Sequence, residues 1–291
     1  MTPIFDAWFA PFEADFFARA LTGGILVAAI CSIVGTWVVI RGMAFLGEAI
    51  GHGMLPGVAI ATVTGAPLIL GAAASAIVMS AAIGLLQRRG KLSYDTSIGL
   101  LFVAMLSLGV IIVSHSRSFA TDATALLFGD ILAIRDSEVI MLTIALAVTI
   151  VVATMFHRAF VAAAFDTRIA STLGLTPRLA QTVLVGLVTL AVVASFQAVG
   201  TLLVVGLLLA PAVAARPWTK RIPAIMLLAA VAGTVAVTIG LLVSWHFSTA
   251  AGASIAGAAI LIAAASSFAR HLTVRFANIG SPTPTPERAS Q

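Results

Sequence analysis

Residues 20–40, ALTGGILVAAICSIVGTWVVI, form a continuous run without a charged residue, and Arg41 follows directly. A helix of roughly 20 apolar residues is long enough to cross the hydrocarbon core of a bilayer. The whole chain repeats this pattern, because 60% of its 291 residues are hydrophobic and only 9% are charged. A soluble domain carries about 25% charged residues. The alternating polar and apolar runs of barrel strands are not found. The sequence therefore predicts an all-α, polytopic membrane protein.

Apolar runs bounded by charged residues or by glycine and proline predict eight or nine transmembrane helices. The count depends on the run 200–215, which is short and contains Pro211, so it is either a full span or a broken, half-spanning helix. Residues 1–17 are then a short extracytoplasmic segment, 18–268 the transmembrane domain, and 269–291 a Pro/Ser/Thr-rich tail that is predicted to be disordered. The runs are 18–40, 44–64, 67–86, 95–114, 138–156, 180–198, 200–215, 223–244 and 251–268.

Charge is divided unequally between the two predicted sides of the membrane. Loops that carry Lys and Arg face the cytoplasm, so the N-terminus is expected outside and the C-terminus in the cytoplasm. The basic residues punctuate the ends of spans rather than form a patch, which argues against nucleic acid as a partner. The predicted inner side carries Arg41, Arg88, Arg89, Lys91, Arg158, Arg168, Arg178, Arg216, Lys220, Arg221, Arg270, Arg275 and Arg288. The predicted outer side carries Arg19, Arg117, Arg135, Asp6, Glu13, Asp15, Asp122, Asp130, Asp136 and Glu138.

Two kinds of chemistry are excluded by what the sequence lacks. Its single cysteine, Cys31, lies within a span, so there is neither a disulfide framework nor a cysteine-based zinc site. No nucleotide-binding motif is visible, so energy for transport must come from an ion gradient or from a partner. The chain is therefore not expected to be an enzyme.

An acid and an imidazole interrupt one apolar run. Residues 47–57, GEAIGHGMLPG, place Glu48 and His52 four positions apart, so both side chains share one face of a helix. Carboxylate oxygen and imidazole nitrogen suit zinc and manganese. One chain supplies two such ligands, and a two-fold dimer would supply four. The alternative is that the two residues pair with each other, or reach water a few residues after Arg41.

Glycines and a proline surround this pair. Gly47 and Gly51, and also Gly53 and Gly57, have the G-x-x-x-G spacing that lets helices approach closely. Pro56 breaks the helical hydrogen-bond ladder, which is tolerated at membrane depth beside a cavity or a neighbouring helix. The stretch is therefore predicted to combine close packing with a helix break.

Weaker candidates lie on the predicted outer side. His115 and His246 fall near the outer ends of spans, where they either assist metal access or are simply solvated. Asp122 and Asp130 belong to an outer loop and are candidates for contact with an extracellular partner or with a cation at the mouth.

The longest predicted inner loop, 157–179, has the signature of a short helix. Asp166 is a candidate cap, Arg168 lies in the first turn, Gly174 is a stop signal and Pro177 begins the next element. Such a helix between two spans suits docking of a soluble cytoplasmic protein. A simple interfacial helix is the alternative.

Four stretches, taken in order, resemble the permease subunits of manganese/zinc-type ABC importers. They are GEAIGHGMLPGVAIA, then YDTSIGLLFVAMLSLGVIIVS followed by LLFGDIL, then FDTRIASTLGL, and finally AVGTLLVVGLLLAPAVAA. Together they cover most of residues 20–268, and their joint order is far more specific than any one of them. The chain departs from the family pattern at Glu48, where aspartate is usual, and at Gly51, where serine is usual.

The resemblance implies the fold of type II ABC importer permeases and a place in the bacterial inner membrane. It implies a homodimer with cytoplasmic subunits that bind ATP and with an extracytoplasmic metal-binding protein. Glu48 and His52 would line the pathway near the dimer axis, and residues 166–177 would engage the ATPase. No resident cofactor is implied, and the cargo would be zinc, the preferred reading, or manganese.

Two other functions remain alternatives. A secondary transporter or channel would use Glu48 and His52 as a relay for metal ions or protons, and inverted repeats with matching broken helices would indicate it. No convincing pair of repeats is found. A permease for a siderophore or cobalamin would need a wider and more neutral lumen, which an acid–histidine pair argues against.

Overall fold

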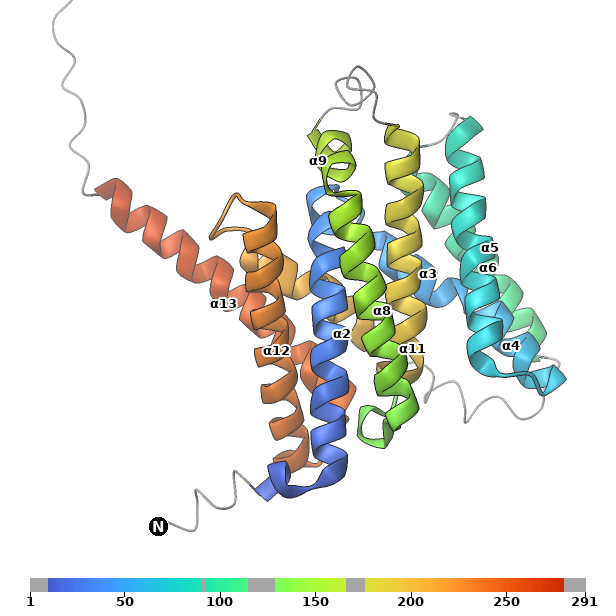
Figure 1. Ribbon diagram of the computed structural model, residues 1–291, viewed down its shortest axis with the longest axis horizontal. Coiled ribbons are helices and arrows are strands. Elements are labelled where there is room, and N and C mark those ends of the chain that lie inside the picture. Colours follow the sequence, from blue (N-terminus) through green and yellow to red (C-terminus); the bar gives the residue numbers. More distant parts are fainter. Residues whose placement is uncertain (1–9, 90–92, 115–128, 166–175, 280–291) are drawn as a thin grey trace, which may run out of the picture.

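The computed structural model describes residues 10–89, 93–114, 129–165 and 176–279, and every regular element in these ranges is a helix (Figure 1). The sequence predictions for His115, Asp122, Asp166, Arg168, Gly174 and the tail beyond residue 279 lie outside the described residues. The first half comprises η1 (Ala10–Glu13), α2 (Asp15–Ile40), α3 (Phe45–Gly53), α4 (Leu55–Thr64), α5 (Leu68–Arg89) and α6 (Tyr94–Ser114). The second half comprises η2 (Ile131–Ala133), α8 (Asp136–Met155), α9 (His157–Phe165), α11 (Pro177–Ala215), α12 (Ile222–Phe247) and α13 (Ala251–Ile279).

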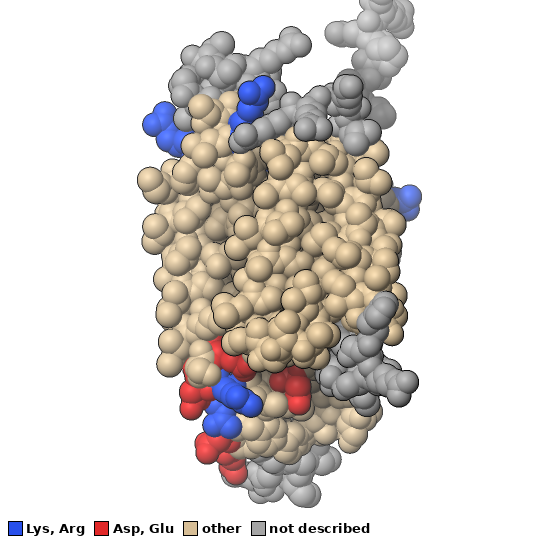
Figure 2. All heavy atoms as spheres, turned by 90° about the vertical axis from the view of Figure 1, so that its right-hand side faces the viewer, with Lys and Arg blue, Asp and Glu red and all other residues tan. Residues whose placement is uncertain are grey.

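Eight helical stretches among the described residues are long and apolar enough to cross a membrane. This confirms the prediction of an all-α protein with many spans. Figure 2 shows a broad central band on one face of the molecule that is almost free of charged side chains, with acidic side chains gathered toward one end and most of the basic ones near the two ends. The eight stretches are Asp15–Ile40, Phe45–Thr64, Leu68–Gln87, Tyr94–Ser114, Asp136–Met155, Pro177–Ala215, Ile222–Phe247 and Ala251–Thr273.

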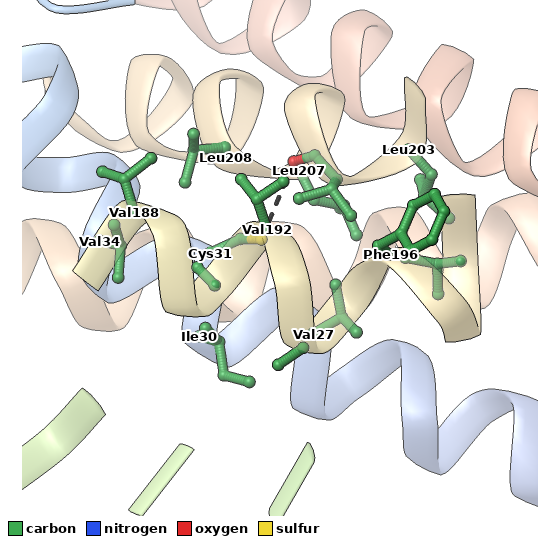
Figure 3. Close-up of a cluster of buried hydrophobic side chains, with 14 of the residues drawn as sticks. Val27, Ile30, Cys31, Val34, Val188, Val192, Phe196, Leu203, Leu207 and Leu208 are labelled. Atoms are coloured by element: carbon green, nitrogen blue, oxygen red, sulfur yellow. Dashed lines mark hydrogen bonds between the residues drawn. The ribbon is translucent and has the colours of Figure 1, made fainter. Parts of the chain in front are cut away.

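The longest of these stretches, α11, is in fact two helices. Gly200 has φ 73° and ψ 167°, which is not helical, and it joins the segments 177–199 and 201–215. In Figure 3, Val188, Val192 and Phe196 of the first segment lie beside Leu208, Leu207 and Leu203 of the second, in reversed order. The chain therefore turns back on itself at Gly200, and the short predicted run at 200–215 is the returning leg of a helical hairpin.

The length of the returning leg explains why the sequence could not decide whether residues 200–215 form a full span or a half-spanning helix. At about 1.5 Å per residue, residues 201–215 extend about 22 Å, less than the roughly 30 Å of a hydrocarbon core. The returning leg reverses the direction of the chain once more than the eight stretches alone would. As a result, the start of α2 and the end of α13 lie at opposite ends of the bundle (Figure 1). The charge pattern predicted an N-terminus outside and a C-terminus in the cytoplasm, and this orientation stays a prediction.

The last helix is longer than the sequence suggested. α13 continues to Ile279, so residues 269–279, predicted as the start of a disordered tail, are helical. The reason is local: this segment contains good helix formers such as Ala269, Arg270 and Leu272, and the breakers Gly280 and Pro282 come only after it. A helix whose apolar part ends at the membrane surface can continue in polar sequence.

The core is built from α2 and the two legs of α11. The most apolar windows of α2 and α11 are 67% and 72% buried inside the protein, equal to or above the 67% of the Phe45–Thr64 stretch, against 17% for α6. Gly35 of α2 packs directly against the backbone carbonyl of Leu208, so the helices meet without an intervening side chain. Beside this contact, the Cys31 Sγ atom lies 3.8 Å from the carbonyl oxygen of Val204 (Figure 3). α2 and α11 thus form a central support for the outer helices.

Candidate metal pathway

Glu48 and His52 lie on one face of α3, as their spacing predicted. Glu48 Oε1 and His52 Nε2 are 2.8 Å apart and hydrogen-bonded. The two side chains are 35% and 23% exposed, so a ligand can approach them from one side. In this structure the acid and the imidazole satisfy each other, and a cation would bind by replacing one partner of that bond.

An aromatic side chain from another helix limits the orientation of the imidazole. Phe102 of α6 packs edge to face against His52, with ring centroids 5.5 Å apart and an interplanar angle of 85°. The same ring contacts Phe45, one turn before Glu48, with centroids 5.3 Å apart. No local pattern in the sequence marked Phe102, because a phenylalanine in a membrane span usually serves only in packing.

The helix that carries the pair is interrupted immediately after it. α3 ends at Gly53 and α4 begins at Leu55, with Met54 between them. Pro56 has no N–H, so it cannot donate to the His52 carbonyl one turn earlier. The Ser75 hydroxyl of α5 donates to the carbonyl of the next residue, Gly53, at 2.7 Å. We call residues 53–57 the elbow; a hydrogen bond from a neighbouring helix holds it.

The four glycines around the pair face two different neighbours. Gly47 lies against the Leu208 side chain, and a Cβ atom at Gly51 would lie 3.6 Å from the Thr201 Cβ atom; both neighbours are on the returning leg of α11. On the other side, Gly53 packs against the Met79 side chain and Gly57 against the backbone of Gly71, both on α5. The elbow therefore packs closely against α5, whereas the glycines before it, Gly47 and Gly51, face the returning leg of α11.

The protein ligands in one chain are few. Among the described residues, no group of three or more His, Cys, Asp or Glu side chains lies close enough together to hold a metal ion. A tetrahedral zinc site needs four ligands, so Glu48 and His52 alone form at most part of a coordination shell. Such a pair suits transient binding of an ion whose remaining coordination positions are filled by water or by other ligands.

The outer candidates that can be placed do not join the pair. Asp130 is exposed and precedes η2. Its neighbour Gly129, with φ 62°, packs against the backbone at Gly200 and so holds this segment on the tip of the α11 hairpin. His246, near the end of α12, lies with its Nδ1 atom 2.8 Å from the Leu242 carbonyl. At the other end of the bundle, Pro177 begins α11, directly after the loop that includes the predicted docking helix.

The fold is thus a helical membrane bundle with an interrupted helix, a helical hairpin and a partly exposed acid–imidazole pair. The chain belongs to the ABC 3 transport family, whose model matches residues 13–270. It is therefore a permease subunit of an ABC transporter, a class whose membrane chain does not itself carry out catalysis.

Similar proteins come from several bacteria. The chain is 34% identical over 250 residues to the "Manganese transport system membrane protein MntC" of Listeria monocytogenes, covering 86% of this chain and 89% of that protein. It is 30% identical over 252 residues to the "Probable iron transport system membrane protein" of Haemophilus influenzae, covering 87% and 93%. A chain of the solved structure "PsaBC from Streptococcus pneumoniae in complex with Fab" superposes with a TM-score of 0.81 at 28% identity, covering 93% and 99%.

Proposed function

We propose that this chain forms the membrane pathway of an ATP-driven importer of a divalent transition metal, with manganese as the principal cargo. The observation that carries the proposal is the Glu48–His52 pair, bonded at 2.8 Å and partly exposed beside a broken helix. An ionisable pair within a membrane span indicates an ion pathway. Membership of a family of ABC permeases makes a self-sufficient secondary transporter or channel the weaker reading.

Manganese rather than zinc follows from two considerations. Relatives from Listeria and from Streptococcus gordonii are named for manganese transport or import. In addition, carboxylate oxygen and water suit manganese, whereas tight zinc sites use several nitrogen or sulfur ligands. Zinc, the cargo preferred from the sequence alone, stays a prediction. Iron is a further candidate, since the Haemophilus relative is named for iron, and the same oxygen–nitrogen pair accepts Fe²⁺.

The working unit is proposed to be a homodimer with cytoplasmic ATP-binding subunits and an extracytoplasmic metal-binding protein, in the bacterial inner membrane. Two copies of the pair around a two-fold axis would offer two carboxylates and two imidazoles. Residues 157–179 are proposed to contact the ATPase, since Pro177 begins the long helix that leads to the α11 hairpin.

In each transport cycle the arriving ion would exchange water for the Glu48 carboxylate and the His52 imidazole. The hydrogen bond between Glu48 and His52 has to break first. The carboxylate and the ring nitrogen then exchange each other for the ion as their partner. Binding and hydrolysis of ATP in the partner subunits would then expose the pathway to the cytoplasm. Because each chain supplies only two protein ligands, the ion is held weakly enough to be released again.

The test is metal uptake into proteoliposomes that contain the permease, its ATPase and its binding protein. Radioactive manganese, zinc and iron(II) are followed for wild type, Glu48→Gln and His52→Ala, with His271→Ala, an exposed histidine of α13, as the histidine control. We expect both pair variants to lose most manganese uptake at equal assembly with the ATPase, and the control to keep it. Uptake that is unchanged in both pair variants would refute the proposal, and a preference for zinc or iron would correct the cargo.

A further inference from the structure

The elbow after His52 is held from outside its own helix, and this contact bears on the proposed pathway. The Ser75 side chain is 7% exposed and its hydroxyl donates to the Gly53 carbonyl at 2.7 Å. Gly53 is the residue directly after His52. In a low-dielectric interior, a buried carbonyl without a donor is costly, so this bond strongly favours one backbone direction.

Packing reinforces the same contact. A side-chain carbon at Gly57 would lie 2.7 Å from the Ser75 Cβ atom and would also strike the backbone of Gly71. Gly53 in turn contacts Met79 of α5. The elbow therefore rests on one face of α5, with Ser75 at its centre. The elbow thus cannot move toward α5 without a clash.

The remaining freedom of His52 is limited at both ends of its side chain. Glu48 binds the Nε2 atom at 2.8 Å, and Phe102 packs across the ring with centroids 5.5 Å apart. Neither contact fixes the backbone that carries the imidazole, because Glu48 is on the same helix and Phe102 contacts only the ring. The Ser75 bond to Gly53 supplies that constraint one residue away.

We propose that Ser75 is a positioning residue for the metal pathway: its hydrogen bond to the Gly53 carbonyl sets the direction in which His52 presents its imidazole to the ion. This rests on the proposed function of the Glu48–His52 pair. Ser75 does not touch the ion in this account. It acts as do the groups that orient metal-ligating histidines in other proteins, whose loss typically lowers metal affinity or activity by about 10- to 100-fold.

Ser80 provides a matched control on the same helix. Its hydroxyl contacts the Thr189 hydroxyl of α11 at 2.6 Å and the Ala76 carbonyl at 2.8 Å. Replacing Ser80 by alanine removes an interhelical hydrogen bond of α5 without touching the elbow. If Ser75→Ala affects metal binding by His52 and Ser80→Ala does not, the effect comes from the orientation of His52 and not from a general loosening of α5.

The experiment uses the full-length permease assembled with its ATPase and binding protein in lipid nanodiscs and supplied with Mn²⁺. Pulsed electron paramagnetic resonance measures the fraction of manganese coupled to an imidazole nitrogen, and vesicle uptake gives the manganese-to-zinc ratio. We expect Ser75→Ala to lower the nitrogen-coupled fraction about tenfold and to shift the uptake ratio. Ser80→Ala should leave both at the wild-type value. Ser75→Cys, which keeps a weak donor of similar shape, should fall between the two and also covers the case in which Ser75→Ala fails to assemble.

The outcomes separate this inference from the proposed function. If His52→Ala abolishes the nitrogen coupling while Ser75→Ala and Ser75→Cys retain it with an unchanged uptake ratio, the role of Ser75 is wrong and the pathway stands. If wild type shows no coupling that depends on His52, the pathway itself is wrong. In a His52→Ala background, Ser75→Ala should have no further effect on the uptake ratio, and an independent effect there would mean that Ser75 acts elsewhere.

Discussion

Replacing Gly200 by alanine tests whether the hairpin of α11 depends on a conformation that only glycine adopts easily. The φ of 73° and ψ of 167° place Gly200 in a region that is essentially closed to residues with a Cβ atom. A residue forced into such a region costs about 1–3 kcal/mol. Since about 1.4 kcal/mol corresponds to a factor of ten, the open form of the hairpin should become about 5- to 150-fold more populated.

The single cysteine provides the assay. Cys31 is fully buried, and its Sγ atom contacts the carbonyl of Val204 on the returning leg of α11 (Figure 3). A small thiol reagent can modify it only when the hairpin separates from α2. When reclosing is faster than modification, the labelling rate follows the open population. The rate for Gly200→Ala should therefore exceed that of wild type by the same factor.

Gly186→Ala is the matched control for this measurement. Gly186 lies on the first leg of α11, has helical geometry, and has open space where its Cβ atom would lie. Alanine is the better helix former, so this variant should label no faster than wild type. Equal labelling rates for Gly200→Ala and Gly186→Ala would show that the reversal does not depend on the backbone angles of Gly200, and the reasoning would be refuted.

Further predictions concern other close contacts. Gly129→Ala should raise the labelling rate of Cys31 at least about fivefold, because φ is 62° at Gly129 and its Cβ atom would press on the backbone at Gly200. Gly57→Ala should lower the free energy of unfolding by about 1–3 kcal/mol in detergent titrations, since overpacking against Gly71 displaces the elbow. Gly84→Ala, which meets open space on α5, should not. Trp218→Phe removes the 2.7 Å hydrogen bond from the indole N–H to Ser266. It should nevertheless lower the free energy of unfolding by less than about 1 kcal/mol, because hydrogen bonds in membrane proteins average about 0.6 kcal/mol. A larger loss would show that this loop contact holds α13 in place.

Local sequence carried the parts of the fold that depend on composition and spacing. Apolar length predicted the spans, and the interval between Glu48 and His52 predicted their shared face, because both follow from the geometry of a single helix. The charge pattern of the loops predicted opposite sides for the two termini. Helix ends were less well predicted, as the extension of α13 to Ile279 shows, because helix formation continues beyond the apolar part.

Contacts between different helices could not be predicted from the sequence of any single helix. Ser75 and Phe102 are ordinary residues in apolar runs, and their relation to His52 arises only when α5 and α6 pack beside α3. Gly200 is one of 24 glycines in the chain, and no neighbouring residue distinguishes it from those that simply allow packing. A reversal made by one residue lacks the polar loop by which sequence patterns usually reveal a turn.

That single-residue reversal also has a consequence for how the protein is made. Because no polar segment separates residues 177–199 from 201–215, there is no loop that the insertion machinery must carry across the membrane between them. The two legs should leave the translocon together as one unit, with Gly200 leading. The first leg would then have its partner from the moment of insertion, and the hairpin would be an early folded piece around which α2 and the later helices assemble.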